Sequence, residues 1–462
     1  MEIQFFGAAE EVTGSCHIVR VGPYQILLDC GLIQGNLKSE ARNREPFPFD
    51  PAVIDAVILS HAHIDHSGRI PLLVRAGFRG AIYCHQATKE LCGIMLRDSA
   101  FLQEKDAESI NRRRARKGLP EVEPLYGVVD AEAALNQLHG VDYDSVHEVL
   151  PGITLRLRDA GHILGSAIVE VWLTEGDKRR KIVFSGDLGH RGAPIMQDYT
   201  LIDDADLVIM ESTYGNRCHR SWDETVQELH DLFHSLQNHP GNILIPSFAV
   251  ERAQELLFLF AKYRQVWQLS DRQIFLDSPL AIEATAIFLR HHQLFDAEAA
   301  RLFQANQQHP LLPNLHFTRD ASESMRLNKI SGAIIIAGSG MCNGGRIVHH
   351  LKHNIWRREC HVLIVGFQAL GTIGRALVDG ARYIRIWGET IKVNATIHTI
   401  GGISAHADQQ DLLTWYRHFQ QRPRLVLVHG EPLAMQSLAS QLRNELQAPV
   451  QIVRSGEKIS LA

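Results

Sequence analysis

The chain has 462 residues, of which 45% are hydrophobic and 21% are charged, and its net charge at pH 7 is −5. This length allows two to four domains, and the slightly acidic balance excludes nucleic-acid binding through an overall positive field. Its seven cysteines are scattered without a CxxC pair, which favours a reducing compartment and argues against cysteine-ligated zinc. The sequence has no signal peptide and no stretch long enough to span a membrane, so we predict a cytoplasmic protein.

Three short strands are predicted before residue 30, at residues 3–6, 14–21 and 25–28. The third strand runs directly into Asp29, a position from which a carboxylate orients a neighbouring metal-ligating histidine. An aspartate that merely starts the turn before Gly31 explains this residue equally well.

Four candidate metal ligands follow the apolar run at residues 56–59, which is predicted to be a buried strand. They are His61, His63, Asp65 and His66, and the loop leaving a strand end can turn several side chains toward one point. Imidazole together with carboxylate suits zinc, with manganese or iron as alternatives. Four ligands at this spacing favour a metal site over a merely solvated polar turn.

Helices are predicted at residues 69–76 and 86–118, and the second ends in the basic run at residues 112–117. This run is suited to contact a phosphate backbone, but we favour a solvated helix end whose cations match the helix dipole. No aromatic residues interleave with these arginines, which weakens an argument for base stacking.

Strands are predicted to return from residue 126 to 209, and three of them end in a polar residue beside glycine. These residues are His162, Asp187 and Glu211, which follow the strands at 154–157, 181–184 and 207–210. Repeated placement of such residues at strand ends indicates a site that is assembled at one edge of a sheet.

From residue 215 to 395 the pattern changes to helices that alternate with parallel-type strands, as in a separate α/β domain. The predicted helices are 224–237, 250–268 and 281–305, and the predicted strands are 242–246, 273–276, 333–337 and 361–365. Small-residue turns after these strands expose backbone N–H groups that favour anions, although ordinary βα-loop chemistry explains them too. The candidate phosphate contacts are Ser247, Ser278, Ser339 and Arg375.

From residue 396 the sequence returns to the pattern of the first domain, in which candidate site residues lie next to the predicted strands and helices. His406 precedes a predicted helix, and His429 follows the predicted strand at 425–428. We therefore predict a first domain formed by residues 1–210 and 396–462, into which a second domain of residues 211–395 is inserted.

HxHxDH at 61–66, His162 in a GH turn and Asp187 in an SGD turn together resemble the metallo-β-lactamase superfamily. Glu211 in ESTYG, His406 in SAHAD and His429 in VHGE resemble motifs A, B and C of its β-CASP branch of RNA-processing nucleases, in the short bacterial form. This resemblance implies an α/β fold: an αββα sandwich with an inserted β-CASP domain and an active site in the cleft between them.

The resemblance also implies the role of each site residue. One zinc ion would be held by His61, His63 and His162, and the second by Asp65, His66 and His429, with Asp187 bridging both. Asp29 would steady the ligands. Glu211 and His406 would form a proton-handling pair, and Asp65 counts among the catalytic residues as well as the ligands.

The implied function is a zinc-dependent ribonuclease that acts on single-stranded RNA as an endonuclease, a 5′-exonuclease or both. Two Zn²⁺ ions per chain, with Mn²⁺ as an alternative, would activate a hydroxide that leaves 5′-phosphate and 3′-hydroxyl ends. We expect single-stranded RNA as the partner and no association with a membrane. A homo-oligomer is compatible with this interpretation.

Three other functions compete with this interpretation. A DNA-directed β-CASP nuclease is disfavoured by the histidine at 429, where DNA-directed members usually carry an apolar residue. A metallohydrolase of small esters or lactones needs neither the inserted domain nor the Glu211–His406 pair. A non-catalytic scaffold is disfavoured because every ligand position is filled.

Overall fold

The computed structural model describes residues 1–305, 312–366, 368–369 and 371–461. The chain forms two compact units. The first unit comprises Met1–Arg191, Asp198–Cys218 and His406–Ala462, and the second comprises Gly192–Gln197 and His219–Ala405. The domain boundaries predicted at residues 211 and 396 stay a prediction.

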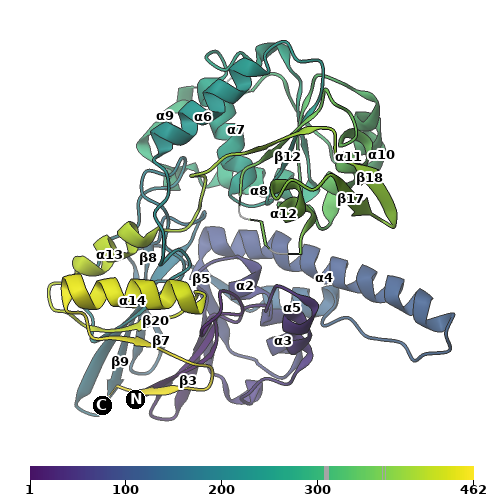
Figure 1. Cartoon of the computed structure of the whole chain (residues 1–462). Helices are drawn as coiled ribbons and strands as arrows, with labels where there is room; N and C mark the ends of the chain where they lie inside the picture. The colour runs from purple at the N-terminus through teal and green to yellow at the C-terminus, as the bar shows by residue number, and fades with distance from the viewer. Residues whose placement is uncertain (306–311, 367, 370, 462) are drawn as a thin grey trace. The chain divides into compact units, whose positions relative to one another are not determined.

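Two seven-stranded sheets build the first unit (Figure 1). The first sheet has the order β22 (Lys458–Ser460), β1 (Glu2–Gly7), β2 (Cys16–Val21), β3 (Tyr24–Leu28), β4 (Ala56–Ile58), β5 (Ala81–His85), β6 (Leu138–Val141). The second has the order β21 (Val450–Ile452), β20 (Arg424–Leu427), β11 (Leu207–Met210), β10 (Lys178–Phe184), β9 (Ala167–Glu175), β8 (Ile153–Asp159), β7 (Val146–Leu150).

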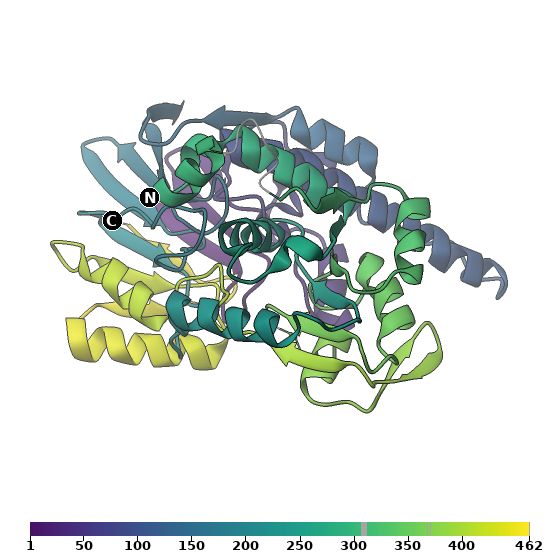
Figure 2. The same cartoon turned by 90° about the horizontal axis from the view of Figure 1, so that it is seen from above.

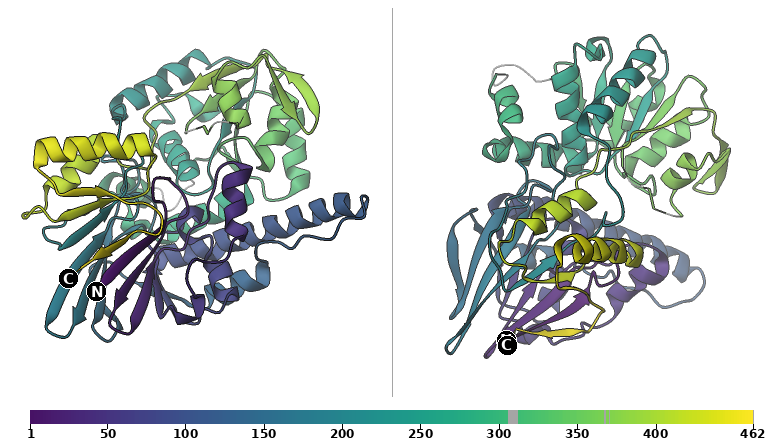
Figure 3. Two further views of the ribbon diagram at one scale, coloured as in Figure 1. Left: turned by 60° about the horizontal axis from the view of Figure 1, so that its bottom comes forward. Right: turned by 60° about the vertical axis from the view of Figure 1, so that its left-hand side comes forward.

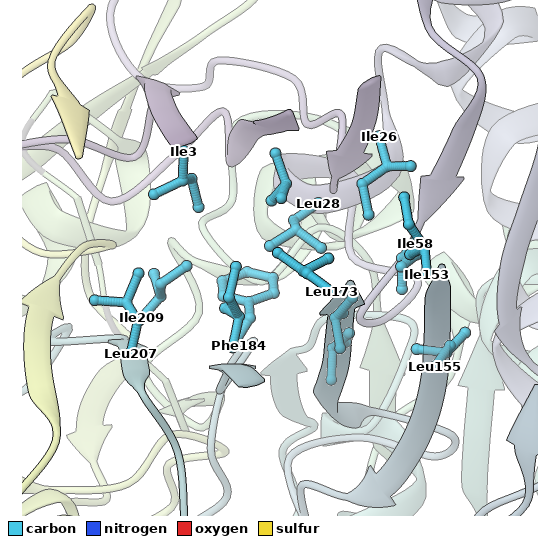
Figure 4. Packing of buried hydrophobic residues seen from close by; sticks show 14 of the residues in the cluster. Ile3, Ile26, Leu28, Ile58, Ile153, Leu155, Leu173, Phe184, Leu207 and Ile209 are labelled. Atoms are coloured by element: carbon cyan, nitrogen blue, oxygen red, sulfur yellow. The ribbon is translucent and has the colours of Figure 1, made fainter. Parts of the chain in front are cut away.

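The core of the first unit lies between these sheets, because alternate side chains of each strand point inward. Along β8, for example, Ile153, Leu155 and Leu157 are fully buried while the residues between them are partly exposed. Figure 4 shows Ile153 and Leu155 on the side of Ile26 and Ile58 of the other sheet. Burial of each such side chain contributes about 1.5–3 kcal/mol, so the two sheets hold each other in place.

Helices cover the outer faces of both sheets. On the first sheet α4 (Gln86–Ala115) packs against β5 and β6, and α3 (Ile70–Arg75) and α5 (Val128–Leu135) pack on each other. On the second sheet α13 (Gln409–Arg417) and α14 (Pro432–Leu446) bury Trp415 and Leu438 against Val208 and Met210. Two shorter helices, α1 (Leu37–Ala41) and α2 (Ile64–Ser67), lie in loops. The predicted αββα sandwich is confirmed.

The ends of the chain meet in the first sheet, where β22 pairs antiparallel with β1 (Figure 3). The C-terminal segment therefore completes both sheets of the first unit, through β22 in one and β20 and β21 in the other. This explains why the sequence pattern of the first domain resumes after the insertion.

Two details of the predicted elements are wrong. The stretch from 126 to 209 contains the helix α5, because Asp130 caps its N-terminus and the run AEAAL consists of good helix formers. The helix predicted at 281–305 is two helices, because the chain turns between them and Asp296 accepts a hydrogen bond from the N–H of Ala299 to start the second.

The second unit contains a six-stranded parallel sheet with helices on both faces (Figure 2). Its order is β14 (Leu315–Phe317), β13 (Ile274–Asp277), β15 (Ile334–Ala337), β12 (Ile243–Pro246), β16 (His361–Ile364), β19 (Thr396–Thr399). The helices are α6 (Trp222–Ser235), α7 (Arg252–Tyr263), α8 (Pro279–Arg290), α9 (Ala297–Ala305), α10 (Ala321–Arg326), α11 (Gly345–Asn354), α12 (Ile373–Val378). A hairpin, β17 (Tyr383–Ile386) and β18 (Glu389–Lys392), completes the unit. None of the helices in the described ranges is both long and apolar enough to cross a bilayer.

Candidate metal centre

The candidate site lies where several strands of the first unit end at one edge. Strands β3 and β4 are parallel neighbours, and β10, β11 and β20 are successive parallel neighbours in the other sheet. β8 runs in the same direction as β10, since both are antiparallel to β9. The segments that follow these six strands carry all the predicted ligands and their partners: Asp29, His61, His63, Asp65, His66, His162, Asp187, Glu211 and His429.

One group of ligand atoms is formed by three histidines and Asp187. His63 Nδ1 lies 3.1 Å from His61 Nε2 and 3.1 Å from His162 Nε2. Asp187 Oδ2 lies 3.6 Å from His61 Nε2 and 3.7 Å from His162 Nε2. Ligands 2.0–2.1 Å from a tetrahedral zinc ion are separated by about 3.3 Å, so these spacings suit such an ion.

A second group is formed by Asp65, His66 and His429. Nε2 of His66 lies 3.1 Å from Nε2 of His429 and 3.9 Å from Asp65 Oδ2, and His429 Nε2 lies 3.4 Å from the same oxygen. Asp187 Oδ2 is 3.3 Å from His66 Nε2. One carboxylate oxygen therefore faces both groups of ligand atoms.

The charge states of His61, His63 and Asp187 fit a bound cation. Burial lowers the pKa of His61 well below its usual value and that of His63 to about 4, so both imidazoles are neutral and keep a lone pair for a metal. Burial alone would raise the pKa of Asp187, but His429 and His66 hold it well below its usual range. Asp187 Oδ1 is buried without a hydrogen-bond partner among the described residues, a costly arrangement that a bound cation would relieve.

Asp29 fixes the orientation of His66. Its Oδ2 accepts hydrogen bonds from His66 Nδ1 at 2.7 Å and from the hydroxyls of Ser15 and Ser60 at 3.0 Å each. Because Nδ1 carries the proton, Nε2 is left as the ligand atom toward Asp65 and His429. Asp29 itself has a left-handed φ of 59°, a conformation that non-glycine residues rarely adopt and that is often found at functional sites.

The loop after β3 packs directly on the loop that carries the central histidines. The N–H of Cys30 donates to the carbonyl of His66 at 2.8 Å, and the N–H of Ser15, in the loop before β2, donates to the carbonyl of Asp65 at 2.9 Å. At Gly31 a Cβ atom would lie 1.5 Å from the carbonyl oxygen of Asp65. Only glycine allows this approach, which places Asp29 within reach of His66.

Thr213 is a further member of the site that we did not predict from the sequence. Its Oγ1 lies 3.0 Å from His429 Nδ1 and donates to the carbonyl of His429 at 3.2 Å. The hydroxyl therefore accepts the Nδ1 proton and leaves Nε2 of His429 facing the second ligand group. The only hint of this role in the sequence is that Thr213 lies two residues after Glu211. The sequence does not show that β11 pairs with β20, the strand that precedes His429.

Glu211 and His406 lie beside the ligands. Glu211 is fully buried, accepts the N–H of Leu188 at 2.7 Å, and has Oε2 3.4 Å from His406 Nδ1. Burial alone would lower the pKa of His406, but Glu211, together with Asp187, raises it to about 9. The side chain of His406 is 22% exposed, whereas that of Glu211 is 0% exposed. A protonated imidazole at neutral pH thus stands at the surface of the site.

The three predicted phosphate-binding serines gather in the second unit. Ser247, Ser278 and Ser339 follow β12, β13 and β15, which are neighbours in the parallel sheet. A Cβ atom on Gly338 would lie 3.7 Å from Ser278 Oγ and 3.8 Å from the carbonyl oxygen of Ser247. Oγ of Ser339 is buried without a hydrogen-bond partner in the described part of the chain, and so it is a polar group suited to receive a ligand.

The remaining basic candidates are placed differently. Arg375 Nε donates to both carboxylate oxygens of Asp379, at 2.8 and 2.9 Å, on the exposed side of α12. The basic run at 112–117 lies at the exposed end of α4, where Asn111 ties the following loop through two hydrogen bonds to the backbone of Val122.

Family profiles match three parts of the chain: a beta-lactamase superfamily domain over residues 24–237, a Beta-Casp domain over 253–377, and a Zn-dependent metallo-hydrolase RNA specificity domain over 390–453. The chain is 39% identical to Ribonuclease TTHA0252 of Thermus thermophilus, over 99% of this chain and 100% of that protein. The chain belongs to the β-CASP branch of the metallo-β-lactamase superfamily.

Other relatives of this β-CASP protein carry a different name. It is 29% identical to the transcription termination factor FttA of Methanosarcina mazei, over 100% of this chain and 72% of that protein, and 31% identical to FttA of Pyrococcus abyssi, over 96% and 69%. A crystal structure of a protein of unknown function from Enterococcus faecalis V583 has a TM-score of 0.58 at 17% identity, covers 100% and 99% of the two chains, and shows the fold alone.

The predicted family and fold class are therefore confirmed. The ligand set is that of a metallohydrolase, and the His and Asp groups of this β-CASP protein are suited to hold metal. The role of each residue, the identity of the metal and the number of ions stay predictions.

Replacing Thr213 by valine should weaken metal binding about 10–100-fold, as expected when a partner that orients a ligand is lost. Valine keeps the shape of threonine but cannot accept the Nδ1 proton of His429. Titration of the metal-free protein with zinc against a chelator of known affinity measures the change. Thr174→Val, on the exposed end of β9, is the matched control, and equal affinities of both variants would contradict the role of Thr213.

Proposed function

We propose that the protein is a zinc-dependent ribonuclease that hydrolyses phosphodiester bonds of single-stranded RNA, as an endonuclease, a 5′-exonuclease or both. The products would carry 5′-phosphate and 3′-hydroxyl ends. The observation that carries the proposal is the placement of Asp187 Oδ2 within 3.3–3.7 Å of histidines from two ligand groups, with the Glu211–His406 pair beside it.

The comparisons support RNA as the substrate. The relative with 39% identity is named a ribonuclease, and the chain covers its whole length. The profile described as an RNA specificity domain spans residues 390–453 and so includes His406 and His429. His429 stands at the position that resembles motif C. DNA-directed members usually carry an apolar residue there, so the histidine also favours RNA over DNA.

The ligand side chains would hold two zinc ions, one with His61, His63 and His162, the other with Asp65, His66 and His429, and Asp187 between them. Bound there, the ions would supply Lewis-acid activation of water and of the phosphate group. The protein contributes the fixed geometry, because Asp29 and Thr213 hold the protons on the ring nitrogens that face away from the ligand groups.

His406 would protonate the oxygen that leaves. When water attacks phosphorus, the bond from phosphorus to the 3′ oxygen breaks, and that oxygen needs a proton to depart as a hydroxyl. Since Nδ1 of His406 faces Glu211, the proton would come from Nε2. Glu211 keeps the imidazole cationic by raising its pKa to about 9, and such general acid catalysis contributes about 10²–10⁴-fold.

The turns of the second unit would hold phosphates of the RNA. Backbone N–H groups and hydroxyls at the ends of parallel strands bind anions well. The buried Ser339 Oγ, together with Ser247 and Ser278, fits this role. Arg375 would have to exchange its contact with Asp379 for a phosphate.

His406→Ala should retain its metal content but lose about 10²–10⁴-fold of its activity on end-labelled single-stranded RNA, because only the proton donor is removed. Elemental analysis and the fragment ladder are measured on the same preparation. His418→Ala removes an exposed histidine paired with Asp203 and serves as control. Parental cleavage by His406→Ala would refute the general-acid role, and preference for DNA or for chromogenic esters in competition would refute the proposed substrate.

Arg375→Ala should weaken RNA binding and reduce the slope of log K against log salt by roughly 0.7, the value for one phosphate contact on a single strand. Asp379→Ala should instead strengthen binding, because it releases the guanidinium from its present partner. Binding to metal-free protein at several salt concentrations measures both. Unchanged slopes in both variants would remove Arg375 from the site.

A further inference from the structure

The hairpin formed by β17 and β18 presents one face to solvent and is anchored by the other. Ile384, Ile386 and Ile391 are buried in the core of the second unit. The alternate positions point outward, where Tyr383 lies opposite Lys392 and Arg385 lies opposite Thr390. We call these four exposed residues, together with Trp387 at the turn, the hairpin face. Figure 2 shows the hairpin at the margin of the second unit.

The hairpin face carries two exposed aromatic rings. Tyr383 is 59% exposed and Trp387 is 61% exposed, although tryptophan is usually well buried. His349 packs against Trp387 with 4.4 Å between ring centroids, and Lys352 Nζ lies 5.7 Å from the ring. These contacts hold the indole in place while most of its surface stays in solvent.

Trp387 occupies a position that suits other residues better. The turn has two residues, and both have positive φ, 49° at Trp387 and 89° at Gly388. Such turns strongly prefer Asn-Gly, and a left-handed conformation is unfavourable for a residue with a Cβ. An exposed indole at a strained position points to a contact outside the folded chain.

The charges around these rings are positive. Arg382, Arg385 and Lys392 are exposed and have no acidic partner within 4.0 Å among the described residues. The nearest acids in sequence are already paired. Glu389 lies 2.7 Å from Lys352, and Asp379 binds Arg375. The hairpin is thus a local basic patch in a chain of net charge −5.

A third exposed aromatic residue lies next to this face. Trp356 is 54% exposed, and its carbonyl accepts a hydrogen bond from Asn394 Nδ2 at 2.8 Å, just beyond the end of β18. Arg358, two residues further on, is also exposed. Trp356 and Arg358 thus add an exposed ring and an exposed cation on a segment that is hydrogen-bonded to the end of the hairpin.

We propose that the hairpin face is an accessory binding site for single-stranded RNA, separate from the hydrolytic residues. Bases stack on Tyr383 and Trp387, and Arg385 and Lys392 contact phosphates. This combination of π-faces with cations is how proteins bind single strands without sequence preference. The exposed cations without acidic partners favour a polyanion such as RNA over a protein partner. The proposal rests on RNA being the ligand, but not on the hydrolysis mechanism.

The test compares hairpin variants with matched controls in metal-free protein, which cannot cleave the probe. The probe is a labelled single-stranded oligonucleotide of about 30 nucleotides, longer than the usual single-strand site of about 4–16. The aromatic variant is Tyr383→Ser/Trp387→Asn, in which asparagine suits the turn. The charge variant is Arg385→Gln/Lys392→Gln. The controls are Phe101→Ser, an aromatic side chain of α4 that is 50% exposed, and Lys178→Gln/Arg179→Gln at the exposed start of β10.

The aromatic variant should bind the RNA about tenfold or more weakly, the charge variant should show a shallower salt dependence, and the controls should match the parent. Zinc-loaded variants should hydrolyse a small chromogenic phosphodiester at the parental rate. Parental RNA binding by both hairpin variants, or equal losses in the controls, would overturn the accessory site. Failure of the parent itself to bind RNA would instead overturn the proposed function.

Discussion

The site depends on a buried carboxylate, Asp187, enclosed by histidines from both ligand groups. A buried negative charge is stable only when positive charge or hydrogen bonds compensate it, and one of its oxygens has no hydrogen bond among the described residues. Neighbouring histidines cannot all be protonated at such short distances, since like charges lower each other's pKa. Cations at the ligand groups would satisfy the carboxylate and the ring nitrogens together, so the electrostatics of the site favour metal.

The sandwich provides the rigid frame that this arrangement requires. Parallel strand ends in two sheets present loops at one edge, and the core between the sheets fixes their separation. Hydrogen bonds on the side away from the ligand atoms then fix the orientation of the imidazole rings of His66 and His429. Asp29 acts on His66, Thr213 acts on His429, and Gly31 allows the loops to touch. Both Asp29 and His429 have left-handed φ angles, which cost energy that the surrounding packing must supply.

The sequence was sufficient to name the candidate ligands that the fold brings together, because the family resemblance points to them and each lies in a segment that follows an apolar strand. It could not reveal Thr213, since that role depends on β11 lying beside β20, which is distant in the chain. The helix α5 was missed because its short run was read with the surrounding strands. Likewise, the exposure of Tyr383 and Trp387 depends on which face of the hairpin the isoleucines bury, and a pattern of alternation alone does not decide this.

The most direct test of the account is the metal content of the purified protein and of Asp187→Ala, measured by elemental analysis after removal of free metal. The account predicts two zinc ions per chain in the parent. It predicts a loss of bound metal in the variant, because both ligand groups share the carboxylate of Asp187. Asp203→Ala, which removes an exposed carboxylate that pairs with His418, should keep the parental content. Full metal content in Asp187→Ala would contradict the shared carboxylate and the two-ion site built on it.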